Sequence, residues 1–382
     1  MATAGDEPKT KAIKKATQNK YPDWAPRFWH GMLFSDWVKL MARNRFRIHP
    51  FRLFLAGNVT CLAVFNSAMR VVQSKIHGRN IDETEIEHPP VFIIGHWRSG
   101  TTFLHELMVR DKRFTYPTTY ECYAPNHFLV TRRVFPTIVG FLLPRKRPMD
   151  NMGAGIKNPQ EDEFALANLG CPSPYWRMAF PNEPPCHMEL LDMEGVSDEL
   201  LARWKHDMLW FAKALTYQTP KPLILKSPPH TGRVQVLAEL FPGAKFIHIT
   251  RHPETLFAST RRLWPSLDMA QGLQHPHHKN LDEYIFTAFE RMYHGFESQR
   301  GSIDPRNICD VRYEDIARDP IGQVQAIYER LELGDFEVCR GDLEAYVAEL
   351  KDYQPNRHVE LEPEIRAEIH RRWAGYFEKY GY

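Results

Sequence analysis

The chain is organised around the pattern of apolar and polar positions at residues 89–110. Two prolines end the preceding segment, and the apolar, mostly β-branched residues 91–94 predict a buried parallel strand. Gly95 and Gly100 bracket a short loop, and residues 101–110 then follow a helical period. Backbone N–H groups and the helix dipole favour negative charge at such a strand-to-helix turn. The pattern therefore predicts an anion-binding loop.

Three further apolar runs predict strands at residues 223–225, 245–250 and 308–311, and each run ends in polar or charged residues. Helical periodicities separate these runs. Strands that alternate with helices predict an α/β fold, a three-layer sandwich in which helices flank a central parallel sheet on both faces. Ligands bind outside the carboxyl ends of the strands in such sheets, so we expect the strand ends to form one site.

The segment before the first strand is rich in aromatic residues and arginine, and we expect a helical extension over residues 21–88. Its stretch 53–69 carries no formal charge, but its 17 residues include Gly57 and Asn58. A bilayer-spanning helix needs about 20 predominantly apolar residues. A helix packed on the protein core fits better, and the flanking arginines also fit a helix on an anionic surface. Peripheral membrane contact through residues 21–78 therefore stays open.

Composition narrows the class of protein without indicating an activity. The chain has 382 residues, of which 43% are apolar and 25% charged, as in ordinary soluble globular proteins. Its formal net charge of +2 argues against a general nucleic-acid binder. Six cysteines occur without a C-x-x-C pair, so we expect neither a disulfide framework nor a metal site.

The first twenty residues are basic and lack the apolar stretch of a secretory signal. We expect a disordered tail over residues 1–20 and a cytoplasmic protein, with membrane association left open. A P-loop-type domain is expected to follow the extension, over residues 89–382. The sequence does not indicate an oligomeric state.

The loop has the glycine spacing of a P-loop, Gly95-(four residues)-Gly100-Thr101-Thr102, with one change. Nucleotide triphosphatases have Lys where this chain has Thr101, and the nearby cation is Arg98. The loop is thus suited to phosphate but not to a magnesium-bound triphosphate. A tight turn that binds nothing is the alternative, because glycine spacing alone is a weak signal.

A second candidate anion site follows the strand predicted at 245–250. Arg251 comes directly after that strand, and Ser259 lies eight residues later in the next helix. A guanidinium and a hydroxyl at adjacent strand and helix ends could hold a second phosphate. The alternative is an Arg251 that pairs with a neighbouring carboxylate.

Taken together, Arg98-Ser99-Gly100-Thr101-Thr102 after a strand, with Arg251 and Ser259 at this separation, resembles the sulfotransferase family. These enzymes use 3′-phosphoadenosine 5′-phosphosulfate (PAPS). The resemblance covers roughly residues 89–380 and is closest to the branch that includes protein-tyrosine sulfotransferases and many bacterial relatives. It implies that Arg98, Ser99, Gly100, Thr101 and Thr102 hold the 5′-phosphosulfate, while Arg251 and Ser259 hold the 3′-phosphate.

The resemblance also implies roles for residues at the other strand ends. Tyr313 matches a position near the nucleotide, and Lys226 matches a lysine that steadies the bridging oxygen as the sulfuryl group leaves. Fixed donors aimed at developing charge are the main device for such a transfer. The basic, glycine-containing phosphate loop near the family's C-terminus has no clean match, and Arg357 is the candidate that replaces it.

A base must take the proton from the acceptor hydroxyl. Glu121 is the first candidate, because it follows the loop helix at about the distance where the family places its glutamate. His127 is a second candidate, since imidazole titrates near neutrality. A third outcome is that neither Glu121 nor His127 is the base. Glu161, Asp162 and Glu163 read instead as acids at a helix start.

The favoured function is therefore transfer of a sulfuryl group from PAPS to a hydroxyl acceptor, without a metal. A P-loop kinase or nucleotide hydrolase is the alternative, but it needs a lysine after Gly100 and an Asp at a strand end for Mg²⁺. An inactive nucleotide-binding module is a further alternative. Aromatic-rich segments mildly favour a lipid, glycolipid or aromatic alcohol as acceptor, and a peptide also remains open.

Overall fold

The computed structural model describes residues 25–137, 155–350 and 360–382. The expected tail 1–20 and the candidate Arg357 lie outside these ranges. A four-stranded sheet lies at the centre, with all neighbouring strands parallel and in the order β2-β1-β3-β4. The strands are β1 (Val91–Ile94), β2 (Ile224–Lys226), β3 (Lys245–Thr250) and β4 (Ile308–Arg312).

The register of the sheet brings the strand ends together at one edge. Ile93 pairs with Lys226 on one side and with Ile247 on the other, and Thr250 pairs with Arg312. The four predicted strands are therefore confirmed. β2 begins one residue later than expected and includes Lys226, which places this side chain at the carboxyl edge.

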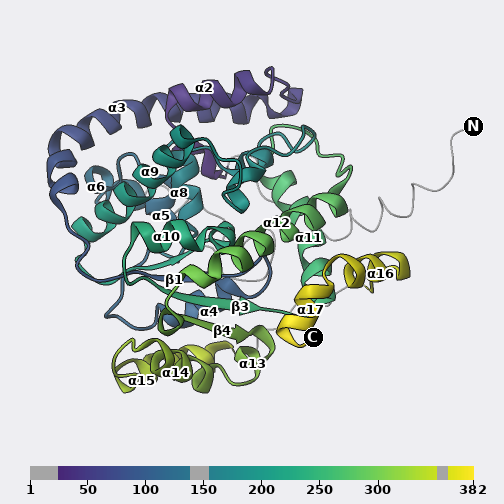
Figure 1. Ribbon diagram of the computed structural model, residues 1–382. Helices are drawn as coiled ribbons and strands as arrows, with labels where there is room; N and C mark the ends of the chain where they lie inside the picture. Colours follow the sequence, from purple (N-terminus) through teal and green to yellow (C-terminus); the bar gives the residue numbers. More distant parts are fainter. Residues whose placement is uncertain (1–24, 138–154, 351–359) are drawn as a thin grey trace, which may run out of the picture.

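Alternate residues of the strands enter two separate cores, one on each face of the sheet. Val91 and Ile93 face a core with Leu104 of α4 and Tyr328 of α14, whereas Phe92 faces a larger core on the opposite side. In Figure 1, helices α13 to α15 lie below the sheet and most others above it. This confirms the three-layer α/β sandwich.

Among the described residues, four helices form the lower layer in the orientation of Figure 1. They are α4 (Thr101–Met108), α13 (Tyr313–Arg318), α14 (Pro320–Leu331) and α15 (Glu337–Glu349). The helices of the upper layer are α5 (Thr119–Tyr123), α6 (Phe128–Thr131), α8 (Asp162–Asn168), α9 (Asp198–Gln218), α10 (Val234–Leu240), α11 (Pro253–Gln271), α12 (Leu281–Gln299), α16 (Pro363–Arg372) and α17 (Ala374–Tyr380).

Two N-terminal helices, α2 (Phe34–Arg43) and α3 (Leu53–Glu83), cover the upper layer from outside (Figure 1). Their inward residues, such as Trp37 and Val59, belong to the same hydrophobic core as Phe92 and Phe246 of the sheet. The expected helical extension is therefore present and shares its core with the sheet. The division at residues 88 and 89 stays a prediction.

Candidate active site

The loop between β1 and α4 has a conformation that depends on its glycines. Gly95 and Gly100 have φ angles of +145° and +108°, and Arg98 between them also has a positive φ of 69°. A Cβ on Gly100 would lie 2.4 Å from Cδ2 of Tyr313. Turns of this kind turn successive backbone N–H groups toward one point and bind anions. The backbone here therefore fits the predicted phosphate loop.

The second predicted anion site lies directly beside this loop. Arg98 Nε donates a hydrogen bond to Ser259 Oγ at 3.0 Å, and Arg251 Nη1 donates to the Arg98 carbonyl oxygen at 2.8 Å. The Arg251 guanidinium stacks over the Tyr313 ring, 4.2 Å from its centre. The structure thus brings together four of the residues predicted to hold the nucleotide.

Arg251 has the surroundings of a residue that binds an anion. Burial lowers the pKa of its guanidinium, and the nearby Arg98 lowers it further, against an opposing effect of Tyr313. Among the described residues, no carboxylate lies within ion-pair distance of Arg251, and its buried Nε has no hydrogen-bond partner. This removes the alternative of a carboxylate pair. A phosphate here would offset the cost of burying the charge.

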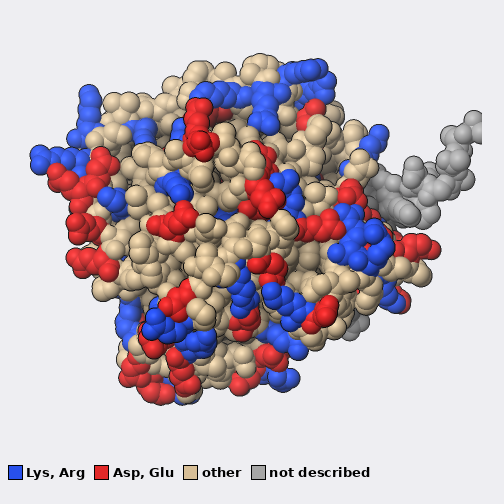
Figure 2. All heavy atoms as spheres, viewed as in Figure 1, with Lys and Arg blue, Asp and Glu red and all other residues tan. Residues whose placement is uncertain are grey.

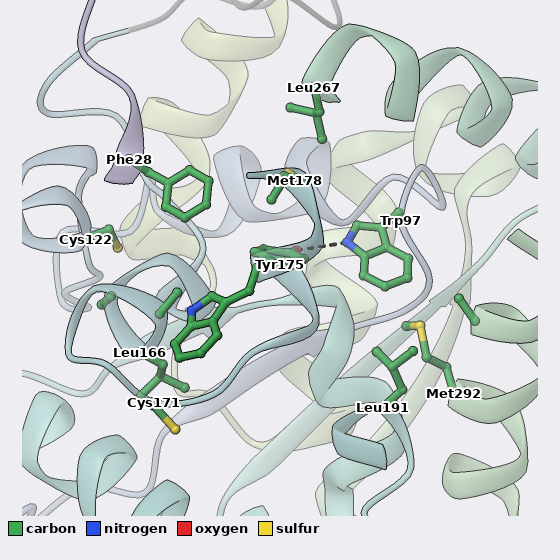
Figure 3. Close-up of a cluster of buried hydrophobic side chains, with 14 of the residues drawn as sticks. Phe28, Trp97, Cys122, Leu166, Cys171, Tyr175, Met178, Leu191, Leu267 and Met292 are labelled. Carbon is green, nitrogen blue, oxygen red and sulfur yellow. Dashed lines mark hydrogen bonds between the residues drawn. The ribbon is translucent and has the colours of Figure 1, made fainter. Parts of the chain in front are cut away.

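A chain of polar contacts begins at Lys226, where β2 ends. Lys226 Nζ lies 2.7 Å from Glu161 Oε1 and 3.5 Å from Thr102 Oγ1, and the side chains of the ion pair are only 2% and 13% exposed. The other Glu161 oxygen accepts a hydrogen bond from the Tyr175 hydroxyl at 2.5 Å. That hydroxyl accepts one from Trp97 Nε1 at 2.9 Å (Figure 3). Glu161 is therefore connected to the loop.

The two acids that follow Glu161 point elsewhere. Asp162 accepts a hydrogen bond from the Ser227 hydroxyl at 2.9 Å and lies 2.5 Å from His230 Nε2. The side chains of Asp162 and His230 are both fully buried. Glu163 forms a buried ion pair with Arg233 at 2.7 Å. Helix α8 does begin at this acidic triplet, as predicted. Glu161 lines the cavity beside the loop, a place that the sequence alone did not indicate for it.

Glu121 and His127 are not among the residues that line the cavity beside the loop. Glu121 Oε2 caps α5 by accepting from the Thr118 N–H at 3.0 Å, and Oε1 accepts from Gln218 at 3.2 Å. His127 is bonded through Nδ1 to Thr131 and through Nε2 to Asn66, and burial lowers its pKa to about 4. Both therefore have structural partners, and their catalytic roles stay predictions.

The cavity beside the loop has both polar and apolar lining residues. Arg98, Thr102, Glu161, Arg251 and Tyr313 are among the polar ones. The apolar wall consists of Trp97, Phe103, Phe164, Tyr175, Met178, Leu263, Trp264 and Leu267. Figure 3 shows Met178 and Leu267 on the same side of the Tyr175 ring, whose hydroxyl points to Trp97. A ligand with an anionic part and an apolar part fits this lining.

Burial raises the pKa of the Tyr175 phenol well above its usual value, and the neighbouring Glu161 charge adds to this effect. The phenol is therefore a neutral hydrogen-bond donor near neutral pH. It positions the Glu161 carboxylate from one side while Lys226 holds it from the other. In the described part of the chain, no group of three His, Cys, Asp or Glu residues could hold a metal ion.

Known proteins resemble this chain over nearly its whole length. The model of the sulfotransferase family matches residues 89–337. The omega-hydroxy-beta-dihydromenaquinone-9 sulfotransferase Stf3 of Mycobacterium bovis and of Mycobacterium tuberculosis is 42% identical over 373 residues, which cover 97% of this chain and 96% of the relative.

Solved structures of low sequence identity share the fold. Sulfotransferase STF9 from Mycobacterium avium superposes with a TM-score of 0.68 at 16% identity, over 99% of this chain and 97% of the other. Sulfotransferase STF1 from Mycobacterium tuberculosis H37Rv gives a TM-score of 0.62 at 17% identity, over 98% and 99%. The family match, the identity to Stf3 and the Arg-Ser-Gly-Thr-Thr loop agree: this chain belongs to the sulfotransferase family.

Proposed function

We propose that this sulfotransferase transfers the sulfuryl group of PAPS to the hydroxyl of a lipid-like alcohol. One observation carries the proposal: loop residues, the buried Arg251 and Glu161, which is paired with Lys226, line a cavity that also has many apolar lining residues. The relative Stf3 is named for a hydroxylated menaquinone as acceptor. An apolar acceptor with a terminal hydroxyl is consistent with both.

In this proposal, the donor lies across the loop with its two phosphate ends held separately. Residues 98–102 hold the 5′-phosphosulfate through backbone N–H groups and hydroxyls. Arg251 and Ser259 hold the 3′-phosphate, and Tyr313 supports Arg251 from beneath. The partnerless Arg251 Nε is the donor most directly available to that phosphate.

Lys226 and Glu161 then divide the chemical work. Glu161 takes the proton of the acceptor hydroxyl while the oxygen of that hydroxyl forms a bond to sulfur. The bond between sulfur and the bridging oxygen of the 5′-phosphate breaks, and Lys226 stabilises the charge that develops on that oxygen. The Lys226–Glu161 ion pair holds both side chains beside the loop until the reactants replace it. Glu161 takes the role that the sequence predicted for Glu121.

The family match favours this activity over the kinase alternative, and Thr101 occupies the position where a kinase-type P-loop has lysine. The inactive-module alternative predicts nucleotide binding without turnover. Labelled PAPS incubated with a series of alcohols separates these outcomes. We expect label on long-chain prenyl or alkyl alcohols, at a rate that rises with chain length. Label only on sugars or peptides would contradict the acceptor class, and no label despite bound nucleotide would indicate an inactive module.

A further inference from the structure

The solvent face of α3 carries many apolar residues, whereas its buried face combines apolar residues such as Leu55 and Val59 with two polar ones. Asn66 and Gln73 point inward, where Asn66 donates to the carbonyl oxygens of His30 and Met32, at 2.6 and 2.9 Å. The outward positions repeat at helical spacing and include the exposed residues Phe54, Cys61, Val64, Ala68, Val71 and Ile76. The outer face of a helix at a water-facing surface is ordinarily polar.

Apolar side chains also gather where α2 meets α3. Phe46, Phe51, Leu53, Phe54 and Met269 form what we call the apolar corner; Phe51 is 90% exposed and Phe46 59%. Phe46 has a left-handed backbone, with φ of 51°, as does the preceding Arg45. A bulky residue in this conformation is strained, and such strain is retained mainly where it serves a function. Here it holds an aromatic side chain out into solvent.

The charge of this surface is mainly positive. Residues 37–81 contain eight Lys and Arg residues and no Asp or Glu, and α3 then ends with Asp82 and Glu83. Nearby acids form ion pairs with these basic residues: Asp36 with Lys39 at 3.3 Å, Glu83 with Arg79 at 2.7 Å and Glu183 with Arg47 at 3.0 Å. In Figure 2, uncharged and basic groups predominate along the topmost edge of the molecule, where Figure 1 places α2 and α3, and acidic groups lie below this edge. Anionic headgroups are the complementary partner.

The apolar corner is fixed to the helix that lines the cavity. Arg52 Nη2 donates to the Met269 carbonyl oxygen at 2.8 Å, and the His49 N–H donates to that of Leu273 at 2.9 Å. Both acceptors lie at the end of α11, and Leu263 and Leu267 of the same helix line the apolar wall. The corner and the acceptor side of the cavity are therefore neighbours along one helix.

We propose that the apolar corner and the outward face of α3 dock on a bilayer that contains anionic lipids. The aromatic side chains enter the headgroup region while the basic residues contact lipid phosphates, as in interfacial helices. Pro50–Glu83 is the one segment of the described residues that is long and apolar enough to cross a membrane. Its inward face, however, packs on α2, α6 and α9, so in this fold it lies along the surface.

Vesicle flotation with the full-length protein tests this docking without using enzymatic activity. Vesicles of phosphatidylcholine alone are compared with vesicles that contain about 30% phosphatidylglycerol. We expect binding mainly to the anionic vesicles, weakened several-fold when salt is raised from about 0.1 M to 0.5 M. The double variant Phe51→Ser/Phe54→Ser should lower the partition coefficient at least about tenfold. Val338→Ser, at an equally exposed valine on α15, is the matched control and should bind like the parent protein.

Three outcomes would overturn the proposal. Equal binding to both kinds of vesicle would remove the role of the arginines. An unchanged partition coefficient in the double variant would remove the role of the corner. A dimer in light scattering that the double variant converts to a monomer, without vesicle binding by either, would make this surface a contact between copies of the chain. Unchanged thermal melting of the variants checks that they fold.

Discussion

Replacing Glu161 by Gln tests the division of labour at the end of β2. Glu161 Oε1 accepts from Lys226 at 2.7 Å and Oε2 from Tyr175 at 2.5 Å. A glutamine keeps one oxygen for Lys226, and its amide can donate to the Tyr175 oxygen, so the shape of the contact survives. What disappears is the negative charge and the ability to take a proton. The variant thus separates chemistry from packing.

The expected magnitude follows from these two losses. Removing a general base slows turnover by about 10²- to 10⁴-fold, which is about 3–5 kcal/mol in the activation barrier. The free energy of unfolding should fall by about 1–3 kcal/mol, because the buried Lys226 keeps a hydrogen bond but loses its charged partner. Affinity for adenosine 3′,5′-bisphosphate should change by less than about threefold. Only kcat, measured at saturating donor, carries the large effect.

Two matched variants make the result interpretable. Glu163→Gln removes a carboxylate two residues away, whose ion pair with Arg233 lies in the core; it should lower stability without a comparable loss of kcat in the folded protein. Glu121→Gln keeps an amide oxygen that can accept from the Thr118 N–H, so α5 retains its capping box and stability should change little. A large loss of kcat in Glu121→Gln together with a normal rate in Glu161→Gln would refute the assignment.

Three further predictions concern the loop, the second anion site and His127. Arg251→Ala should weaken adenosine 3′,5′-bisphosphate about 10- to 100-fold in titration calorimetry but adenosine 5′-phosphate much less; equal losses would contradict a 3′-phosphate site. Gly100→Ala should abolish tight bisphosphate binding, because its Cβ would lie 2.4 Å from the Tyr313 ring. Gly341→Ala, which has open space around it, is the control and should bind normally. Normal binding by both variants would disprove the close packing of the loop. Burial lowers the pKa of His127 to about 4, so between about pH 6.5 and 4 mainly the unfolded state carries a proton on this residue. Stability therefore falls as the pH drops through this window. His127→Gln should reduce the number of protons taken up on unfolding at pH 5 by about one, and an unchanged proton uptake would contradict this prediction.

The sheet and its loop could be predicted because their signals are local. The run at 91–94, its bracketing glycines and the apolar run at 245–250 each specify an element within a few residues, and the structure confirms them. The common edge followed from the rule that parallel strands place their carboxyl ends together. Arg98, Ser259 and Arg251 were therefore expected to be neighbours, and they are in contact.

The role of Glu161 was not predictable from the same signals. Three consecutive acids at a helix start look alike in sequence, and their partners Lys226, His230 and Arg233 lie 65 to 70 residues away. One signal was present: Glu161 occupies the N-cap position of α8, where Ser, Thr, Asp or Asn is preferred. A glutamate there, without a capping bond of its own, indicates a carboxylate held by a distant partner.

The most direct test of the account is a comparison of two ligands by titration calorimetry, adenosine 3′,5′-bisphosphate without metal and ATP with Mg²⁺. The loop lacks the lysine of a triphosphate site, and we propose that Arg251 with Ser259 forms a second anion site beside it. We therefore predict tight binding of the bisphosphate alone, at least about 100-fold stronger than that of ATP–Mg²⁺. Stronger binding of ATP, or bisphosphate binding that requires Mg²⁺, would contradict the proposed donor site.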